Sequence, residues 1–196
     1  MRKVGILIFD KIEVLDFAGP FEVFSVSYDD AGNKLYDAQL IAEEDRIIKA
    51  RNNFLVQPNL TIDTDEKFDI MVVPGGFGTR TLMHNEAIKK WLQKQFNQVE
   101  LMLSVCTGSL VLATTGLLGG LSATTHHAAM KELEAVAPNT TIISNTKYVD
   151  NGKVVTAAGI SAGIEMALHI VARHHGIEQA RKTANYMEYT WIEEEG

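Results

Sequence analysis

The chain has 196 residues, 46% hydrophobic and 22% charged, which is an ordinary balance for a globular protein and predicts a single domain over residues 1–196. Its net charge of −7, without clustered Lys and Arg, excludes nucleic acid as an expected partner, because phosphate binding needs several neighbouring cations. The apolar run near the N-terminus is too short for a signal peptide or a membrane span, and the single cysteine allows no internal disulfide, so we expect a cytoplasmic protein.

Continuous apolar runs of strand length mark the chain from its beginning. Runs such as VGILIF at Val4–Phe9 are typical of strands buried on both faces. Near the C-terminal third, Asn151-Gly152 is a strong hairpin-turn signal between two strand-like segments. Further strands are predicted at Leu35–Ala42, Phe68–Val73, 99–105, Thr140–Ile143, Tyr148–Asp150 and Val154–Ala157, with short strands or hairpin pieces between 47 and 62.

Helix signals alternate with these strands. Pro20 suits the first turn of a helix over Gly19–Val26. Asn85 is a typical N-cap and predicts a helix that continues through Phe96. Gly176 is placed as the C-cap between two further helices. The remaining helices are predicted directly after Cys106, within Ala123–Ala135, at Ser161–His174 and at Ile177–Tyr189.

This alternation predicts an α/β fold with a mostly parallel sheet covered by helices on both faces. In such folds ligands bind at the carboxyl ends of the strands. Three candidate positions fall at such ends: Asp16 after the first strand, Gly75-Gly76 after Phe68–Val73, and Cys106 after the strand at 99–105. We therefore expect them to converge on one site.

Cys106 lies where a strand turns sharply into a helix, with the small residues Thr107 and Gly108 following. The partial positive charge of a helix N-terminus favours a thiolate, and a tight strand-to-helix turn resembles the nucleophile elbow of α/β-hydrolases. These features indicate a nucleophile with a lowered pKa. The alternative is a small buried hydrophobic residue, the commonest role of a free cysteine.

Asp16 stands between Leu15 and Phe17 in an apolar setting. A desolvated carboxyl group there would have a raised pKa and could hold and deliver a proton. The alternative is that Asp16 is the N-cap of the helix expected to open at Gly19-Pro20.

The backbone N–H groups of Gly76 and Thr107 are candidates for an oxyanion-type pocket, although paired glycines also simply form turns. His126 follows Thr124-Thr125 at an expected strand exit, where it is either a site residue or a structural histidine. No H-E-x-x-H or H-x-x-x-H spacing occurs, so no metal site is expected.

Five segments together carry a family pattern, and the last three together are highly specific. The segments are LDFAGPFEVF (15–24), VVPGGFG (72–78), SVCTGSLVLATTGLLGG (104–120), ATTHH (123–127) and TAAGISAGIEMAL (156–168). On these segments the chain resembles the DJ-1/PfpI superfamily, also called ThiJ/PfpI, over essentially its full length, and most of all the isonitrile hydratase branch. It also resembles the sensor-like domains that are fused to AraC-type regulators.

The resemblance implies a flavodoxin-like three-layer sandwich, a nucleophile elbow and a homodimer. It matches Cys106 to the nucleophile, Asp16 to the neighbouring carboxylate and Thr107 to the hydroxyl residue that accompanies the cysteine. It further matches Gly76 to the oxyanion loop and His126 to a histidine near the cysteine. Because Thr107 stands where protease-like members have histidine, a Cys-His protease dyad is not expected.

The function implied by the resemblance is a hydro-lyase without a cofactor, in which Cys106 attacks an isonitrile and water releases an N-substituted formamide. The expected partner is thus a small electrophilic substrate. Two alternatives stay open: a glyoxalase- or deglycase-like enzyme that acts on small dicarbonyls, and a non-catalytic sensor, in which Cys106 is oxidised or a small ligand binds the pocket. No DNA-binding segment follows residue 191, so a complete AraC-type regulator is not expected.

Overall fold

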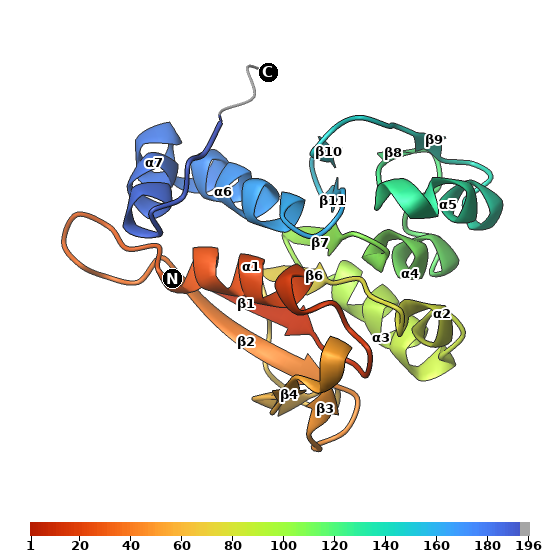
Figure 1. The fold of residues 1–196 in the computed structure, drawn as a ribbon. Coiled ribbons are helices and arrows are strands. Elements are labelled where there is room, and N and C mark those ends of the chain that lie inside the picture. The colour runs from red at the N-terminus through yellow and green to blue at the C-terminus, as the bar shows by residue number, and fades with distance from the viewer. Residues whose placement is uncertain (193–196) are drawn as a thin grey trace.

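A seven-stranded sheet runs through the computed structural model, which describes residues 1–192 (Figure 1). All neighbouring strands are parallel except the last pair at one edge, which forms an antiparallel hairpin. In spatial order the strands are β10 (Tyr148–Asp150), β11 (Val154–Ala157), β7 (Leu101–Val105), β6 (Ile70–Val73), β1 (Arg2–Leu7), β2 (Tyr36–Ala42) and β5 (Leu60–Thr61).

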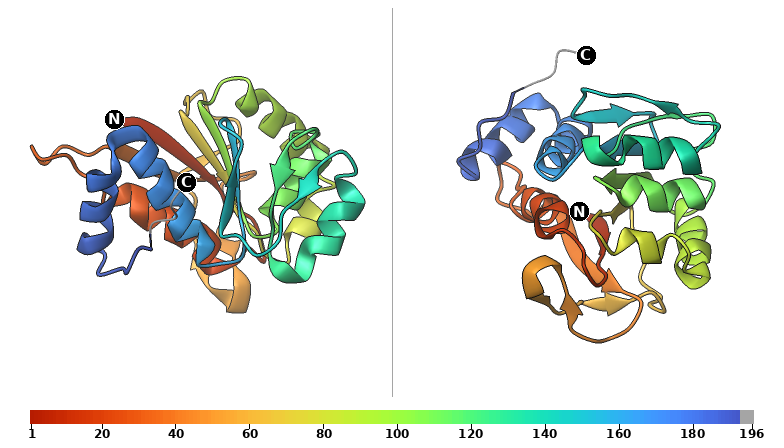
Figure 2. Two further views of the ribbon diagram at one scale, coloured as in Figure 1. Left: turned by 90° about the horizontal axis from the view of Figure 1, so that it is seen from above. Right: turned by 45° about the vertical axis from the view of Figure 1, so that its right-hand side comes forward.

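Helices cover both faces of this sheet, so the fold is the predicted flavodoxin-like three-layer sandwich (Figure 2). One layer holds α1 (Val14–Ser25), α6 (Ala162–His175) and α7 (Ile177–Tyr186). The other holds α2 (Thr79–Leu82), α3 (Glu86–Phe96), α4 (Gly108–Thr114) and α5 (Met130–Val136). Within residues 1–192, every helix is too short or too polar to cross a membrane.

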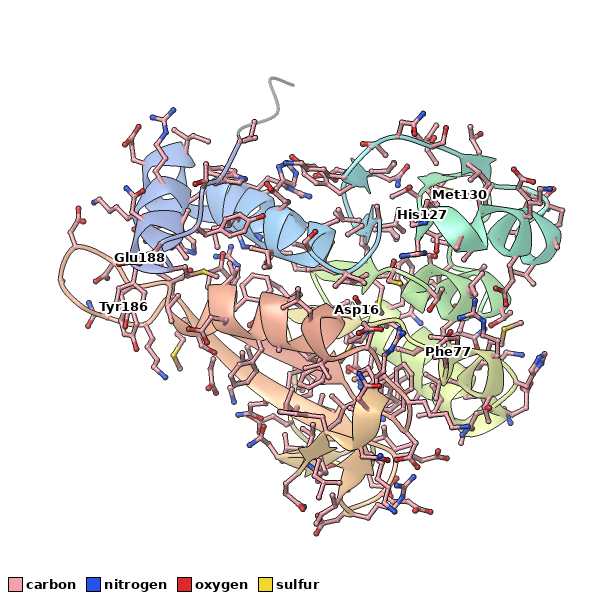
Figure 3. All side chains as sticks on the ribbon, in the orientation of Figure 1. Asp16, Phe77, His127, Met130, Tyr186 and Glu188 are labelled. Carbon is pink, nitrogen blue, oxygen red and sulfur yellow. The ribbon has the colours of Figure 1, made fainter. Side chains whose placement is uncertain are left out.

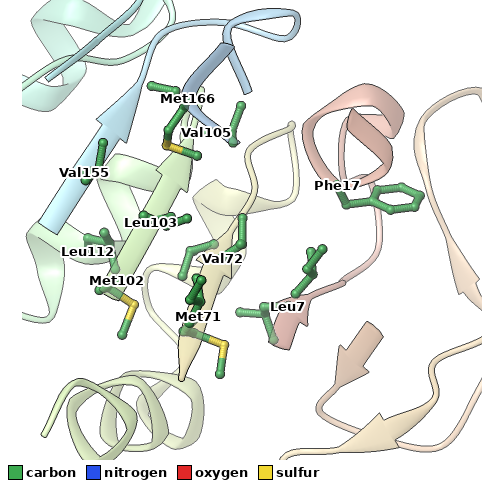
Figure 4. Close-up of a cluster of buried hydrophobic side chains, with 14 of the residues drawn as sticks. Leu7, Phe17, Met71, Val72, Met102, Leu103, Val105, Leu112, Val155 and Met166 are labelled. Carbon is green, nitrogen blue, oxygen red and sulfur yellow. The ribbon is translucent and has the colours of Figure 1, made fainter. Parts of the chain in front are cut away.

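The core lies between the sheet and these helices (Figure 4). Every residue of β6 and β7 is buried, as expected for central strands covered on both faces. Met71, Met102 and Met166 fill irregular space between branched aliphatic side chains in this core. Packing on both faces therefore fixes β6 and β7, two of the strands that lead into the candidate site.

Short elements extend from this frame. β3 (Ile48–Lys49) and β4 (Leu55–Val56) form a small antiparallel hairpin around the 3₁₀ turn η1 (Arg51–Asn53). The hairpin bonds to the loop after β1, where the Lys11 N–H donates to the carbonyl of Lys49 at 2.8 Å. The other short elements are β8 (Ser122–Ala123), β9 (Thr141–Ile142) and the 3₁₀ turn η2 (His127–Ala129).

Several local predictions are confirmed. The Asn85 side chain caps α3 by accepting hydrogen bonds from the N–H groups of Ala87 and Ile88 at 3.0 and 3.2 Å. Gly152 has a φ of 84° in the turn between β10 and β11, and Gly176 has a φ of 88° between α6 and α7.

The predicted start of the first helix was wrong. α1 begins at Val14, five residues before Gly19, and Pro20 lies inside it. Proline has no N–H, so the carbonyl of Asp16 lacks the usual helical bond from residue 20. The helix continues because its buried face packs on α6, where a Cβ atom at Gly19 would lie 2.9 Å from Ile164.

Candidate active site

The topology brings the candidate residues to one edge of the sheet. The main parallel strands lie in the order β2, β1, β6, β7 and β11. Numbered by their sequence among these five, this is the order 2-1-3-4-5, and the direction of winding reverses between β1 and β6. Ligands bind at such a switch point, beyond the carboxyl ends of the strands. Asp16 follows β1, Gly75 follows β6, and Cys106 follows β7.

Cys106 occupies a strained turn. Its φ is +55°, a left-handed conformation that is uncommon for residues other than glycine. Its N–H donates to the carbonyl of Ala158 at 2.8 Å, and its carbonyl accepts from the hydroxyls of Thr125 at 2.9 Å and Ser109 at 3.1 Å. These bonds, made from several elements, hold the turn in the form of the predicted nucleophile elbow.

Glycines allow the elbow to approach β6 closely. A Cβ atom at Gly108 would lie 1.9 Å from the carbonyl oxygen of Val73, and one at Gly75 would lie 2.5 Å from the backbone nitrogen of Thr107. Because real side chains do not tolerate such distances, only glycine fits at these two positions without backbone movement.

Asp16 is fully buried on the first turn of α1, and its role as N-cap was a wrong alternative, because Glu13 occupies that position. The carboxyl oxygen Oδ2 accepts a hydrogen bond from the N–H of Gly75 at 3.0 Å. The carboxyl group also interacts with the Cys106 thiol, while Oδ1 makes no hydrogen bond of regular geometry. Burial raises the pKa of Asp16 to about 7, against the opposing effect of the Gly75 N–H.

The expected low pKa of Cys106 was wrong. The thiol is only 6% exposed, and burial together with the negative charge of Asp16 raises its pKa to about 12. The Thr107 N–H and hydroxyl both act in the opposite direction, by stabilising the thiolate. Near neutral pH the pair therefore holds a protonated thiol beside a carboxyl group that is ready to gain or lose a proton.

Gly76 and Thr107 lie together, but not as an open pair of donors. The Gly76 N–H donates to Oγ1 of Thr107 at 2.9 Å, so it is not free to bind a developing oxyanion as predicted. The Thr107 N–H is directed instead at the Cys106 sulfur. Gly76 has a φ of +126° and lines the cavity above Cys106.

His126 also lines this cavity. Its Nδ1 accepts a hydrogen bond from the N–H of Ala128 at 3.2 Å, so Nε2 carries the proton of the neutral ring. Burial lowers the pKa of His126, which favours this neutral form. The ring packs on Gly159, where a Cβ atom would lie 2.2 Å from Cδ2. The ring is therefore a fixed hydrogen-bond donor rather than a cation.

The cavity is small, at about 190 Å³, and its rim contains residues that sequence reasoning missed. Arg51 pairs with Glu13 at 2.7 Å and lies over the ring of Phe77, 5.1 Å from its centroid. Arg80 pairs with Glu132 through Nε at 3.0 Å. Figure 3 shows Asp16 at the end of α1 nearest the segment that carries Phe77. No local sequence pattern marks these arginines, because their partners come from distant segments.

The part of the chain that the structure describes contains no cluster of three or more metal-binding side chains of the His, Cys, Asp and Glu types. The fold and this geometry together define an α/β protein with a buried cysteine on a strained strand-to-helix turn, beside a protonatable carboxyl group. The chain belongs to the DJ-1/PfpI family, whose sequence pattern matches residues 2–173.

Comparison with known proteins gives relatives of more than one kind. Isonitrile hydratase of Pseudomonas putida is 32% identical over 187 residues, which cover 95% of this chain and 78% of that protein. The HTH-type transcriptional regulator GbdR of Pseudomonas aeruginosa is 25% identical over 99% of this chain, which spans 52% of that regulator.

Solved structures support the fold. A ThiJ/PfpI family protein from Pseudomonas syringae superposes with a TM-score of 0.86 at 22% identity, covering 98% of this chain and 76% of that one. Drosophila melanogaster DJ-1beta gives a TM-score of 0.84 at 20% identity, covering 97% of this chain and 99% of that one.

Proposed function

We propose that this protein is a cysteine-dependent hydro-lyase that converts isonitriles to N-substituted formamides. The observation that carries the proposal is the buried pair of Cys106 and Asp16, in which a thiol on a strained elbow adjoins a carboxyl group with a pKa of about 7. Such a carboxyl group can both accept and donate a proton near neutral pH. The 32% identity to isonitrile hydratase of Pseudomonas putida supports this reaction class.

In the first step, Sγ of Cys106 forms a bond to the terminal carbon of the isonitrile. The thiol proton passes to the Asp16 carboxylate as this bond forms, because the thiol has too high a pKa to ionise beforehand. Asp16, helped by Thr107, then delivers the proton to the same carbon. The result is a thioimidate, in which that carbon carries one hydrogen, a single bond to sulfur and a double bond to nitrogen.

In the second step, water adds to the thioimidate carbon. The water oxygen bonds to carbon, and one water proton goes to the nitrogen. The carbon–sulfur bond then breaks, the second water proton returns to the sulfur, and the formamide carbonyl forms. The sum is addition of one water to the substrate without net oxidation or reduction, so the reaction needs no redox cofactor.

The cavity suits a neutral, compact substrate. Its volume of about 190 Å³ fits a small molecule, and the side chains of Phe77 and Ile160 offer apolar surface for an alkyl or aryl group. The neutral His126 can donate from Nε2 to a substrate atom. The ion pairs of Arg51 and Arg80 lie at the rim, where they neutralise the charges of both arginines.

A second candidate function is a non-catalytic sensor, which the similarity of GbdR over 99% of this chain favours. In that case a small ligand would occupy the same cavity, and Cys106 would catalyse no reaction.

The test is formamide production by the purified protein from a simple alkyl isonitrile, followed by NMR, beside methylglyoxal as the substrate of a glyoxalase-like activity. We expect turnover of the isonitrile that is lost in Cys106→Ser. Turnover of methylglyoxal alone would replace the proposed reaction by the dicarbonyl one. Binding of the isonitrile without product would support the sensor.

A further inference from the structure

Thr79 lies beneath the candidate active site and does not face the cavity. Its side chain is fully buried at the start of α2. Its Oγ1 lies 2.7 Å from the carbonyl oxygen of Gly76 and 3.0 Å from Oγ1 of Thr107. The guanidinium group of Arg80 donates to the same Thr79 hydroxyl oxygen at 3.3 Å. A chain of hydrogen-bonded polar groups thus leads from Arg80 through Thr79 to Thr107, which is the residue after Cys106 in the chain.

Each threonine hydroxyl has one proton, so its hydrogen bonds can be counted. In one arrangement, Thr79 donates to the Gly76 carbonyl and Thr107 donates to Oγ1 of Thr79 or to the same carbonyl at 3.2 Å. The Thr107 proton then points away from the sulfur. The Gly76 N–H occupies one lone pair of the Thr107 oxygen in either case.

In the second arrangement, Thr79 donates to Oγ1 of Thr107. The two lone pairs of the Thr107 oxygen are then filled by Gly76 and Thr79, and its proton is left to point at the Cys106 sulfur, with which this hydroxyl interacts. The Gly76 carbonyl keeps the N–H of Thr79 at 3.2 Å and the guanidinium of Arg80 at 3.3 Å. No buried polar group loses its last partner in the exchange.

We infer that Thr79 is a positioning residue, whose hydroxyl turns the Thr107 proton toward the Cys106 sulfur when negative charge develops there. Arg80 completes this chain: it donates to the Gly76 carbonyl, which accepts the Thr79 proton in the first arrangement, and to the Thr79 hydroxyl oxygen in both. The inference rests on the proposed function in one respect, because it takes Cys106 as the group on which charge develops.

The experiment is the alkylation rate of Cys106 by iodoacetamide between pH 6 and 10, which needs no substrate and therefore stands or fails separately from isonitrile turnover. Thr79→Val keeps the shape and removes the hydroxyl. One hydrogen bond is typically equivalent to about a 3- to 10-fold change. We expect the rate to fall about 3- to 10-fold at each pH, and Thr79→Ser to restore it. Should Thr79→Val not fold, Thr79→Ala takes its place.

Two controls separate positioning from general packing. Thr79→Val added to Thr107→Val should cause no further loss, because the relay is then already broken. Thr115→Val removes another buried hydroxyl, which bonds only locally to the Leu112 carbonyl, and should alkylate like the natural protein. Three results would each overturn the inference: an unchanged alkylation rate of Cys106 in Thr79→Val, a lowered rate in Thr79→Ser, or a further loss of rate when Thr79→Val is added to Thr107→Val.

Discussion

Replacing the Asp16 carboxyl group by an amide tests whether Asp16 carries a proton in the reaction or has a purely structural role. If Asp16 moves the proton between Cys106 and the substrate carbon, Asp16→Asn should lower turnover by about 10²- to 10⁴-fold, the usual contribution of a general acid–base group. The amide oxygen can still accept the Gly75 N–H, so the fold should persist. Steady-state rates beside circular dichroism spectra check this. Natural turnover in a folded variant would remove Asp16 from the mechanism.

The same residue makes stability depend on pH. The folded-state pKa of about 7 exceeds the ordinary 3.8, so Asp16 binds its proton more tightly in the folded protein. Its stabilising effect is therefore complete below pH 3.8 and is lost as the pH rises through 7. The difference of about three pH units between the folded-state pKa of Asp16 and its ordinary value corresponds to at most about 4 kcal/mol in the free energy of unfolding.

Asp16→Asn carries no charge at any pH, so its melting temperature relative to the natural protein should rise between pH 4 and pH 8 by several degrees. Melting curves of both proteins at matched ionic strength measure this difference. A difference in melting temperature that stays constant over that range would show that ionisation of the buried Asp16 does not destabilise the folded protein.

The junction between β6, the elbow and α4 depends on a glycine. In Gly108→Ala the new methyl group would meet the Val73 carbonyl at 1.9 Å, so the backbone of one element must move. We expect a loss of about 1–3 kcal/mol or more in the free energy of unfolding, typical of overpacking. Gly119→Ala is the matched control, because its nearest contact is at 3.7 Å. Urea denaturation measures both, and equal stability of the two variants would contradict the prediction.

Local signals predicted the elements that depend on local contacts. The cap and apolar periodicity of α3 lie within the helix itself, and the turn between β10 and β11 needs only Asn151-Gly152. α1 was misplaced because Pro20 carries a strong local signal that packing against α6 overrides. α2 was missed because four residues are too few to show a helical period.

The candidate site was predicted in place but not in detail. The convergence of Asp16, Gly76 and Cys106 follows from the general rule for parallel sheets. Their chemistry does not, because it depends on partners brought in by the fold. Burial and the Asp16 charge raise the thiol pKa instead of lowering it, and the Thr107 hydroxyl occupies the Gly76 N–H. Neither effect is encoded in residue type or local spacing.

At the scale of the whole molecule, apolar side chains collect on the β3–β4 hairpin. Ile47, Phe54 and Leu55 are 53%, 54% and 59% exposed. Exposed apolar surface of this kind favours association, and a homodimer is the arrangement that the family resemblance implies. We expect a particle of about 43 kDa, twice the 21.6 kDa of the chain, in multi-angle light scattering at micromolar concentration. A clean 21.6 kDa species would contradict it.

The two borders of the sheet limit what such an assembly can look like. β5 has two residues and β10 has three, so each border presents very few unpaired backbone groups. A strand of a neighbouring chain could pair with very few backbone N–H and C=O groups at either edge, and this also protects the protein from edge-to-edge aggregation. Two copies would therefore join through side chains, and amide exchange at both borders should remain as fast in the assembly as in the isolated chain.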